Sequence, residues 1–386
     1  MEIYIVIPGD TVELIAQKTE SDVESLIYAN QLVYPYRLAI GQALIIPGEK
    51  QAERGIRTNG YAYTYIDSWV LSQTLPYLSA LSVFSYGFTR EGDLVKPPRD
   101  ETWMIEAARE ADTVSILTLT PLDAQGRFSN YLITAIVENE AARKNLISQV
   151  METVRQKGYG GVDIDFEYIR KEDRDGFTGF AAEMAAALHA EGYRLSIALA
   201  PKTSKDQPGL LYEGKDYGAL GEIADEVLLM TYEWGYKYGP NMAVAPLNMV
   251  RRVVEYALTE IPAEKINLGI PNYGYDWPLP FVRGVTEART IGNVEAVEIA
   301  IENSAVIQFD EVAKSPFFRY TKEGIEHEVW FEDPRSIDEK LGLVKEYGLR
   351  GTGWWQIMRL WRAGWIATEE QFFIQKGEVK TSVQIL

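Results

Sequence analysis

The sequence predicts an α/β fold: a (β/α)8 barrel of the TIM type, with a small α+β insertion after its seventh strand and a small βααβ module before it. From residue 58 onward, short apolar runs alternate with helical patterns, which is typical of a parallel sheet covered by helices. Eight such units fit into about 320 residues, as a barrel requires. One apolar run is also interrupted by acidic residues at every second position, which predicts a reactive strand.

The predicted barrel strands lie at residues 59–63, 80–86, 114–119, 161–167, 195–200, 226–232, 266–271 and 351–356. Helices are predicted between them, at 140–156, 174–190, 245–258 and 336–347 among others. The stretch at about 276–335 has short apolar runs and turns instead, which predicts the α+β insertion beside the barrel mouth. In such barrels, the chemistry gathers at the C-terminal ends of the strands.

The first 47 residues predict a separate domain with strands at 3–7 and 43–47. Two helices are expected between them, the first capped by Asp10 with Glu13 three residues later, and the second started in the same way by Ser21-Asp22-Val23-Glu24. Residues 48–57 are polar without an apolar period, which predicts a linker. The barrel domain is then expected at 58–377.

Composition excludes several classes of function. The net charge of −18 opposes binding to phosphate backbones, so nucleic acid is excluded as a partner. The absence of Cys excludes thiolate chemistry, and two His remove the usual serine-hydrolase and multi-His zinc arrangements, so no metal or cofactor is expected. No apolar run reaches membrane-spanning length, and the N-terminus lacks the pattern of a standard secretion signal.

The most informative run is 160–167, where acidic and apolar residues alternate. On a strand, Asp163, Asp165 and Glu167 would share one face and the apolar residues between them the other. Neighbouring carboxylates in a partly dry site cannot all ionise, so at least one pKa is expected to be raised. Glu167, nearest the strand's end, is the predicted general acid. The alternative is a solvated edge strand, although a strand within a βαβ series is normally covered by helices.

The N-terminal module resembles the LysM domain over its full length, on the pattern Tyr4-x-Val6-x-x-Gly9-Asp10-Thr11 and Gly41-x-x-Leu44-x-Ile46-Pro47. LysM domains bind polymers that contain N-acetylglucosamine, such as peptidoglycan and chitin. The resemblance implies that Gly9, Asp10 and Thr11 form a glycan groove with the loop at 33–41. The alternative is that Gly9 and Asp10 only make the turn and cap the helix.

The barrel resembles glycoside hydrolase family 18, the chitinase-like enzymes, over nearly all of residues 58–377. The matching motifs are Asp163-x-Asp165-x-Glu167 on the fourth strand, Met230-Thr231-Tyr232-Glu233 on the sixth, Gly60-Tyr61 on the first, Tyr273-Gly274 after the seventh and Trp355 at the end of the eighth. Two positions depart from the family: Gly160 stands where an additional Asp is usual, and Glu233 replaces an Asp.

The resemblance implies retaining catalysis assisted by the substrate's own acetamido group. Glu167 would protonate the glycosidic oxygen, Asp165 supported by Asp163 would hold the acetamido N–H, and Tyr232 would donate to its oxygen. Substrate-binding positions implied in the same way are Trp355 as an apolar floor, with Glu233, Tyr61, Tyr86, Tyr273, Tyr275 and Met230. The alternatives are core packing for Trp355 and a local ion network for Tyr232 and Glu233.

Together, the LysM-like module, the barrel and the segment 330–336 resemble the spore cortex-lytic and spore-germination branch of the family. This implies cleavage of β-1,4 bonds next to N-acetylglucosamine in spore cortex peptidoglycan, by an enzyme made in the mother cell and placed on the spore. A chitinase is the second enzyme reading. A catalytically silent lectin that binds chitin or peptidoglycan is the reading from another class, but such lectins typically lose the acid that Glu167 supplies here.

Overall fold

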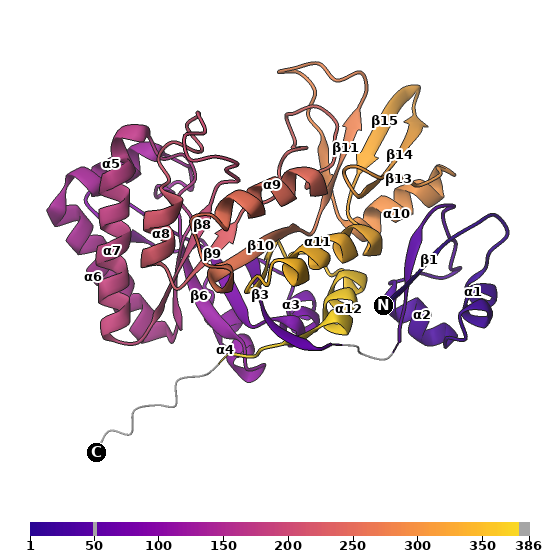
Figure 1. Cartoon of the computed structure of the whole chain (residues 1–386), viewed down its shortest axis with the longest axis horizontal. Helices are drawn as coiled ribbons and strands as arrows, with labels where there is room; N and C mark the ends of the chain where they lie inside the picture. The colour runs from indigo at the N-terminus through magenta and orange to yellow at the C-terminus, as the bar shows by residue number, and fades with distance from the viewer. Residues whose placement is uncertain (49–51, 378–386) are drawn as a thin grey trace.

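The computed structural model describes residues 1–48 and 52–377 and contains the three predicted parts: an N-terminal module, a barrel and an insertion (Figure 1). The module is confirmed as βααβ, with an antiparallel pair of strands enclosing two helices. Its elements are β1 Glu2–Ile5, α1 Val12–Lys18, α2 Val23–Ala29 and β2 Ala43–Ile46.

The helix caps of the module differ from the prediction by one residue. Thr11, not Asp10, caps α1, because its hydroxyl accepts a hydrogen bond from the Leu14 amide at 3.2 Å. Asp22, not Ser21, caps α2. The Asp10 carboxylate accepts hydrogen bonds from the Ile7 amide and the Tyr4 hydroxyl instead, so it fastens the turn before the helix.

The predicted barrel is confirmed. Its eight parallel strands follow one another in chain order around a closed ring, and the pairing of the first with the second completes the closure. They are β3 Arg54–Tyr63, β4 Ala80–Phe88, β6 Val114–Leu119, β7 Gly161–Ile164, β8 Arg194–Leu199, β9 Glu226–Leu229, β10 Ile266–Pro271 and β16 Gly351–Trp355, with the short strands β5 Leu94–Val95 and β17 Phe372–Ile374 at the rims.

Helices cover the outside of the ring (Figure 1). In the described chain they are α3 Ser68–Thr74, α4 Thr102–Glu110, α5 Asn130–Glu138, α6 Glu140–Lys157, α7 Arg174–Ala190, α8 Tyr217–Ile223, α9 Leu247–Ala257, α11 Pro334–Glu346 and α12 Arg362–Gln371, with 3₁₀ turns at Leu75–Tyr77, Lys171–Asp173 and Ala263–Lys265.

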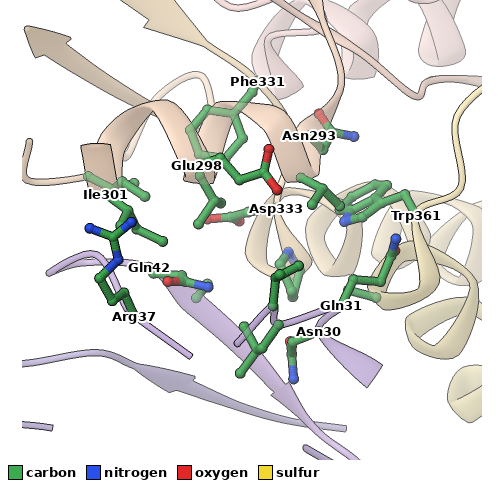
Figure 2. Close-up of a pocket in the computed structure, with 18 of the residues that line it drawn as sticks. Asn30, Gln31, Arg37, Gln42, Asn293, Glu298, Ile301, Phe331, Asp333 and Trp361 are labelled. Carbon is green, nitrogen blue, oxygen red and sulfur yellow. The ribbon is translucent and has the colours of Figure 1, made fainter. Parts of the chain in front are cut away.

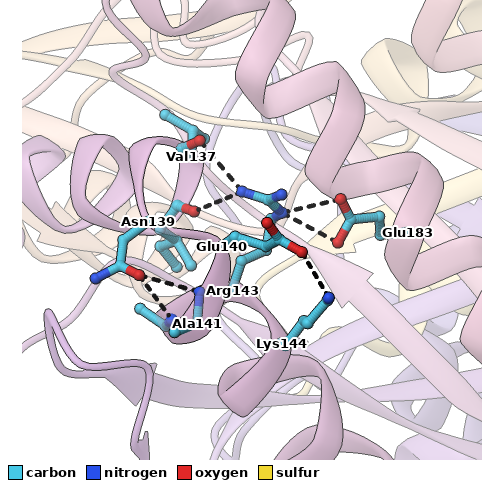
Figure 3. A network of polar contacts seen from close by, with 9 residues as sticks. Val137, Asn139, Glu140, Ala141, Arg143, Lys144 and Glu183 are labelled. Carbon is cyan, nitrogen blue, oxygen red and sulfur yellow. Dashed lines mark hydrogen bonds and ion pairs between the residues drawn. The ribbon is translucent and has the colours of Figure 1, made fainter.

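One polar network joins three outer helices (Figure 3). Arg143 of α6 donates to both carboxylate oxygens of Glu183 on α7, each at 3.0 Å, and to the carbonyls of Ile136 and Val137 at the end of α5. The Asn139 side chain caps α6 from the same junction. Carbonyls in the last turn of a helix have no partner within it. The Arg143 guanidinium therefore provides hydrogen-bond donors for two carbonyls at the end of α5. It also links this end to α7, the helix that packs behind the acidic strand.

The first barrel strand starts earlier than predicted. It begins at Arg54, so residues 54–57 belong to the sheet and not to a linker. Two contacts explain the difference: β17 pairs with Arg54–Ile56, and the Arg54 guanidinium donates to the carbonyl of Val344 in the last turn of α11 and to those of Gly348 and Leu349 after it. Polar composition hid a strand whose partners lie about 300 residues away in sequence.

The insertion carries its own sheet, as predicted. Its five antiparallel strands have the order β12-β11-β15-β14-β13, and α10 packs on them. The bounds are β11 Gly274–Pro278, β12 Arg289–Ile291, α10 Asn293–Glu302, β13 Gln308–Asp310, β14 Ser315–Lys322 and β15 Ile325–Trp330.

The N-terminal module is docked onto the insertion and the barrel. The Ile307 amide donates to the Ile40 carbonyl at 2.9 Å, and the Gln31 side chain makes two hydrogen bonds to the backbone of Leu360 and Arg362. Ala29 and Ile45 of the module are fully buried in the same apolar core as the barrel. We call this contact region the seam.

The seam encloses a cavity of about 330 Å³ (Figure 2). Arg37 and Gln42 reach it from the module, Glu298 and Ile301 from α10, and Trp361 from the segment before α12. The loop 33–41, which resemblance assigns to glycan binding, therefore has one side facing the insertion.

Candidate active site

The acidic row lies at the mouth of the barrel. Strand β7 ends at Ile164, earlier than the predicted 167, because the neighbouring strand β6 ends opposite it at Leu119. Asp165 and Glu167 follow in an extended segment, held by a hydrogen bond from the Asp165 amide to the Leu119 carbonyl at 3.0 Å. The predicted alternation persists beyond the strand: Phe166 is buried and stacks on Phe180 of α7 with the rings 5.8 Å apart.

The three carboxyls have unusual electrostatics. Asp163 is fully buried, and its Oδ2 accepts a hydrogen bond from the Tyr61 hydroxyl at 3.1 Å; burial raises the pKa of Asp163 to about 6. The pKa of Asp165 is raised well above its usual value, by burial first and then by the charges of Glu167 and Asp163. Burial also raises the pKa of Glu167. The row therefore favours a shared proton over full ionisation near neutral pH.

Two oxygens of the row are left without a partner. Within the described residues, Oδ1 of Asp163 and Oδ1 of Asp165 accept no hydrogen bond although both are buried. An unsatisfied buried acceptor costs about 1–3 kcal/mol. A catalytic role is one explanation for such groups in native structures, and both of these oxygens belong to the acidic row.

The sixth strand supplies the opposite wall. Tyr232 is buried three residues after β9, and the next residue, Glu233, has a left-handed backbone with φ of 66°. The hydroxyl of Tyr275 donates to Glu233 Oε1 at 2.9 Å, and the hydroxyl of Tyr273 donates to the same oxygen. Burial raises the pKa of Glu233 even so. Glu233 thus sits in a hydrogen-bond network with Tyr273 and Tyr275.

A cleft of about 500 Å³ opens above these groups. It brings together most of the predicted site residues: Asp165, Glu167, Met230, Tyr232, Glu233, Tyr273, Tyr275 and Trp355. Trp355 is half-buried and lies at the cleft, whereas the neighbouring Trp354 is fully buried in the core. Packing in the core, the alternative considered for Trp355, is found for its neighbour Trp354 instead.

Two predicted substrate-binding tyrosines lie elsewhere. Tyr61 is buried below the cleft, where it contacts Asp163. The prediction for Tyr86 is corrected: Tyr86 is fully buried, its hydroxyl donates to Glu101, and its ring packs on Tyr159. The register of β4 shifts between Val83 and Tyr86, which turns this side chain away from the barrel interior.

Sequence reasoning missed several aromatic residues. Tyr63 packs against Trp355 and Tyr65, with ring centroids 6.0 Å and 5.2 Å apart. The strand period of two could have found Tyr63, which shares a face with Tyr61 on β3. The missed residues that line the cleft itself come from loops and carry no such signal: Tyr168, Tyr212, Trp234 and Tyr236. A buried lysine, Lys215, was also missed.

The position of Gly160 explains one departure from the family pattern. A Cβ atom there would lie 2.3 Å from Cγ1 of Val114 on the neighbouring strand. Real Cβ atoms do not approach so closely, so the additional Asp has no room while Val114 keeps its place.

The three LysM residues have structural partners in the module. Gly9 has a positive φ of 88° at the turn, Thr11 caps α1, and Asp10 pairs with Lys18 at 2.7 Å in addition to its two hydrogen bonds. These contacts account for all three residues without a ligand. A glycan-binding role for them stays a prediction.

No metal centre is found among residues 1–48 and 52–377, where no three His, Cys, Asp or Glu side chains are arranged to hold an ion. The two histidines pair with Asp225 and Asp276 outside the cleft. No helix in the described chain is long and apolar enough to cross a membrane.

Comparison with known proteins agrees with this geometry. The family model of the glycosyl hydrolases family 18 matches residues 125–359, and the LysM domain model matches residues 4–47. The chain is 40% identical to the cortical fragment-lytic enzyme of Bacillus subtilis, over 97% of this chain and 99% of that protein.

Solved structures extend the comparison. The crystal structure of the Bacillus megaterium spore cortex-lytic enzyme SleL has a TM-score of 0.92 and 33% identity, covering 97% of this chain and 98% of that one. A chitinase from Chromobacterium violaceum has a TM-score of 0.76 and 25% identity, covering 82% of this chain and 98% of that one. A carboxylate row at the mouth of a closed barrel, a cleft above it and these matches lead to one conclusion: the chain belongs to the glycosyl hydrolases of family 18.

Proposed function

We propose that this protein cleaves β-1,4 bonds next to N-acetylglucosamine in spore cortex peptidoglycan. The observation that carries the proposal is the arrangement of the acids: Glu167 lines the cleft at the end of a row in which Asp163 and Asp165 are buried behind it. A carboxyl that is protonated near neutral pH is what a leaving glycosidic oxygen requires.

Glu167 is the general acid in this proposal. Its pKa is raised by burial, so it holds a proton at the cleft surface at a pH where an exposed glutamate is ionised. It gives that proton to the glycosidic oxygen as the bond breaks, and the resulting carboxylate later takes a proton from the attacking water. One residue thus serves both steps.

The substrate supplies the nucleophile. The carbonyl oxygen of the 2-acetamido group attacks the anomeric carbon and forms an oxazolinium ion, the substrate-assisted route known for this family. Asp165 accepts a hydrogen bond from the acetamido N–H and stabilises the positive charge through its own negative charge. Asp163 shares a proton with Asp165, and Tyr232 donates its hydroxyl to the acetamido oxygen and aligns it.

The rest of the cleft holds the sugar. The half-buried Trp355 is the apolar floor, and Met230 and the Glu233 network with Tyr273 and Tyr275 form the wall. Because two tyrosine hydroxyls already donate to Oε1 of Glu233, its other oxygen is the one available to a sugar hydroxyl. Tyr61 acts one layer below, by holding Asp163.

Cortex as the substrate is supported by the relatives named for cortex lysis, which match the chain across both domains. On this basis we place the protein at the spore of a spore-forming bacterium. The LysM module would contribute affinity for the same polymer, with Gly9, Asp10, Thr11 and the outer side of the loop 33–41 as the contact region.

A chitinase is the second candidate, favoured by the likeness to the Chromobacterium violaceum chitinase. The two readings differ in product. We expect cortex fragments to be cleaved to products with N-acetylglucosamine at the new reducing end, faster than chitin oligomers of equal length. Mass spectrometry of both digests measures this. Faster cleavage of chitin oligomers would replace the cortex reading by the chitinase, and no cleavage of either glycan would favour a lectin.

A further inference from the structure

A buried lysine lies beside the acidic row. Lys215, in the segment before α8, is 0% exposed, and its ammonium group donates a hydrogen bond to the Ala198 carbonyl on β8 at 3.2 Å. Strands β7 and β8 pair Ile164 with Ile197, so the next residues along the chain, Asp165 and Ala198, lie at the same height. Neighbouring strands lie about 4.8 Å apart. The ammonium is therefore one strand away from Asp165 at the same level of the barrel.

This placement is costly for the fold. An ammonium buried without an ion pair loses several kcal/mol of hydration. In the described part of the chain, no carboxylate is within the 4.0 Å of an ion pair with Lys215, and Ala198 is the hydrogen-bond partner of its ammonium. Lys215 therefore interacts with the acids through the low-dielectric interior rather than by contact.

The charges that face Lys215 are those of the row. Asp165, Glu167 and Asp163 act on it in that order, against the burial that lowers the pKa of Lys215 to about 8. The next residue, Asp216, is turned away and pairs with Arg174 at 2.5 Å. Lys215 is thus the cation that balances the row.

We propose that Lys215 is a positioning residue for the reaction: its buried positive charge keeps the pair formed by Asp163 and Asp165 negatively charged while the oxazolinium ion forms. This inference rests on the proposed function. The pair shares one proton and carries one negative charge. Without the cation it takes up a second proton more readily and becomes neutral, and a neutral pair gives no electrostatic stabilisation to the positive intermediate. No bond is made to Lys215 and no proton leaves it during the cycle.

Lys215 should shape the pH dependence of the rate. Without its positive charge, the carboxyls of the row bind protons more tightly, so the pair formed by Asp163 and Asp165 becomes neutral at a higher pH. A variant that lacks the charge should therefore lose rate on the acid side, at a pH where the wild type is still fully active.

A second buried lysine provides a matched control. Lys202 is 1% exposed, and its ammonium donates to the Lys215 carbonyl at 3.0 Å, so it braces the same segment. The charges acting on Lys202 are Arg174, Asp216, Asp206 and Glu260, all outside the acidic row. Loss of Lys202 should weaken the segment without removing the charge that the row experiences.

The test compares Lys215→Met, Lys215→Gln, Lys215→Arg and Lys202→Met. For each folded variant, kcat and KM on soluble cortex fragments are measured from pH 4 to pH 9, together with the melting temperature. We expect Lys215→Met and Lys215→Gln to lower kcat about 10- to 100-fold with KM within about twofold, because the lost charge acts in the transition state. Their acid limb should move to higher pH.

The remaining variants separate charge from packing. Lys215→Arg should recover most of the rate and the acid limb of the wild type, since arginine stays charged. Lys202→Met should lower the melting temperature and keep the wild-type pH profile. Lys215→Gln retains an amide donor for Ala198 and serves if Lys215→Met does not fold.

Two results would count against the inference. An unchanged pH profile in Lys215→Gln, with an active wild type, would overturn the role of Lys215 and leave the proposed function intact. A pH profile shifted equally in Lys202→Met would show that only the shape of the segment matters. A wild type that cleaves neither cortex nor chitin fragments would overturn the proposed function itself.

Discussion

The barrel mouth and the seam are built on opposite principles. At the mouth, carboxyls are buried against their preference, two of their oxygens lack partners within the described chain, and Glu233 adopts a left-handed backbone. At the seam, the side-chain amide of Gln31 both donates and accepts a hydrogen bond, and the Ile307 amide donates to the Ile40 carbonyl. Ala29 and Ile45 are fully buried there. The mouth contains unfavourable interactions at the proposed reaction site, and the seam contains favourable ones that contribute stability.

The comparison changes how the N-terminal module is understood. A module on a flexible tether raises the local concentration of its partner and leaves the partner's fold unaffected. Here, the module shares an apolar core with the barrel and a backbone hydrogen bond with the insertion. It is part of one body with the catalytic domain, so changes at the seam should act on stability and changes at the mouth on rate.

The largest effect is expected for Glu167→Gln. The variant keeps the volume of the side chain and removes the proton donor, so kcat should fall by about 10² to 10⁴. Initial rates on soluble cortex fragments measure the loss, and the melting temperature should stay within about 2 °C of wild type. The exposed Glu172, changed to Gln, is the control and should retain full activity. Substantial turnover by the Glu167 variant would remove this residue from the mechanism.

Asp165→Asn and Tyr232→Phe should each slow the first chemical step. Both lose an interaction with the acetamido group that strengthens in the transition state, for which about 10² in kcat is a reasonable scale. Single-turnover kinetics should show the loss in bond cleavage with KM little changed. Normal cleavage of an analogue that lacks the acetamido group would instead indicate a mechanism with two protein carboxylates.

The seam is tested most sharply by Gly41→Ala. The new Cβ would lie 1.9 Å from the Ile307 carbonyl oxygen, and the backbone has φ of 81°. Gly324→Ala is the matched control, since φ is 80° and nothing lies within 4 Å of its Cβ. Both pay about 1–2 kcal/mol for the left-handed backbone, and only Gly41→Ala should lose more, by opening the seam. Equal melting temperatures for the two variants would contradict a docked module.

The smallest predicted effect is a gain in stability from Asp163→Asn. The folded carboxyl has a pKa of about 6 against 3.8 for the unfolded chain, so the folded state binds the proton more tightly. Stability therefore falls as pH rises from about 4 to 6, and the penalty is fully present at pH 7. Replacement by a neutral amide should raise the unfolding free energy at pH 7 by about 2–3 kcal/mol and change little at pH 3. Denaturant unfolding at both pH values measures the difference.

What the sequence predicted was local. The period of two placed Asp163, Asp165 and Glu167 on one face, and that face survives although the strand ends at Ile164. Alternating apolar and helical runs gave the barrel because each βα unit is a local pattern. Motif resemblance predicted the remaining cleft residues, which follow β9 and β10 or lie at the end of β16, and the barrel closure brings them to the same mouth.

What the sequence did not predict depends on distant partners. Arg54 begins a strand only because β17 and the end of α11 lie beside it. Tyr86 turns outward because β4 shifts its register against β6. Lys215 lies in a segment without any period, and its burial follows from where β7 and β8 stand in the ring. The seam unites residues of the module with residues more than 250 positions later, and no local pattern encodes that contact.

The pairing of the first barrel strand with the last ones has a consequence for biosynthesis. β3 takes its partners β16 and β17 from residues 351–374, so it remains an open edge until almost the whole described chain has left the ribosome. Tyr61 and Trp355, which contact each other at 5.9 Å, lie on the two sides of that closure. Contacts between ends so far apart form late. A nascent or C-terminally truncated chain that lacks β16 therefore has neither a closed ring nor Trp355 at its cleft, and hydrolytic capacity arises only after β16 has been made.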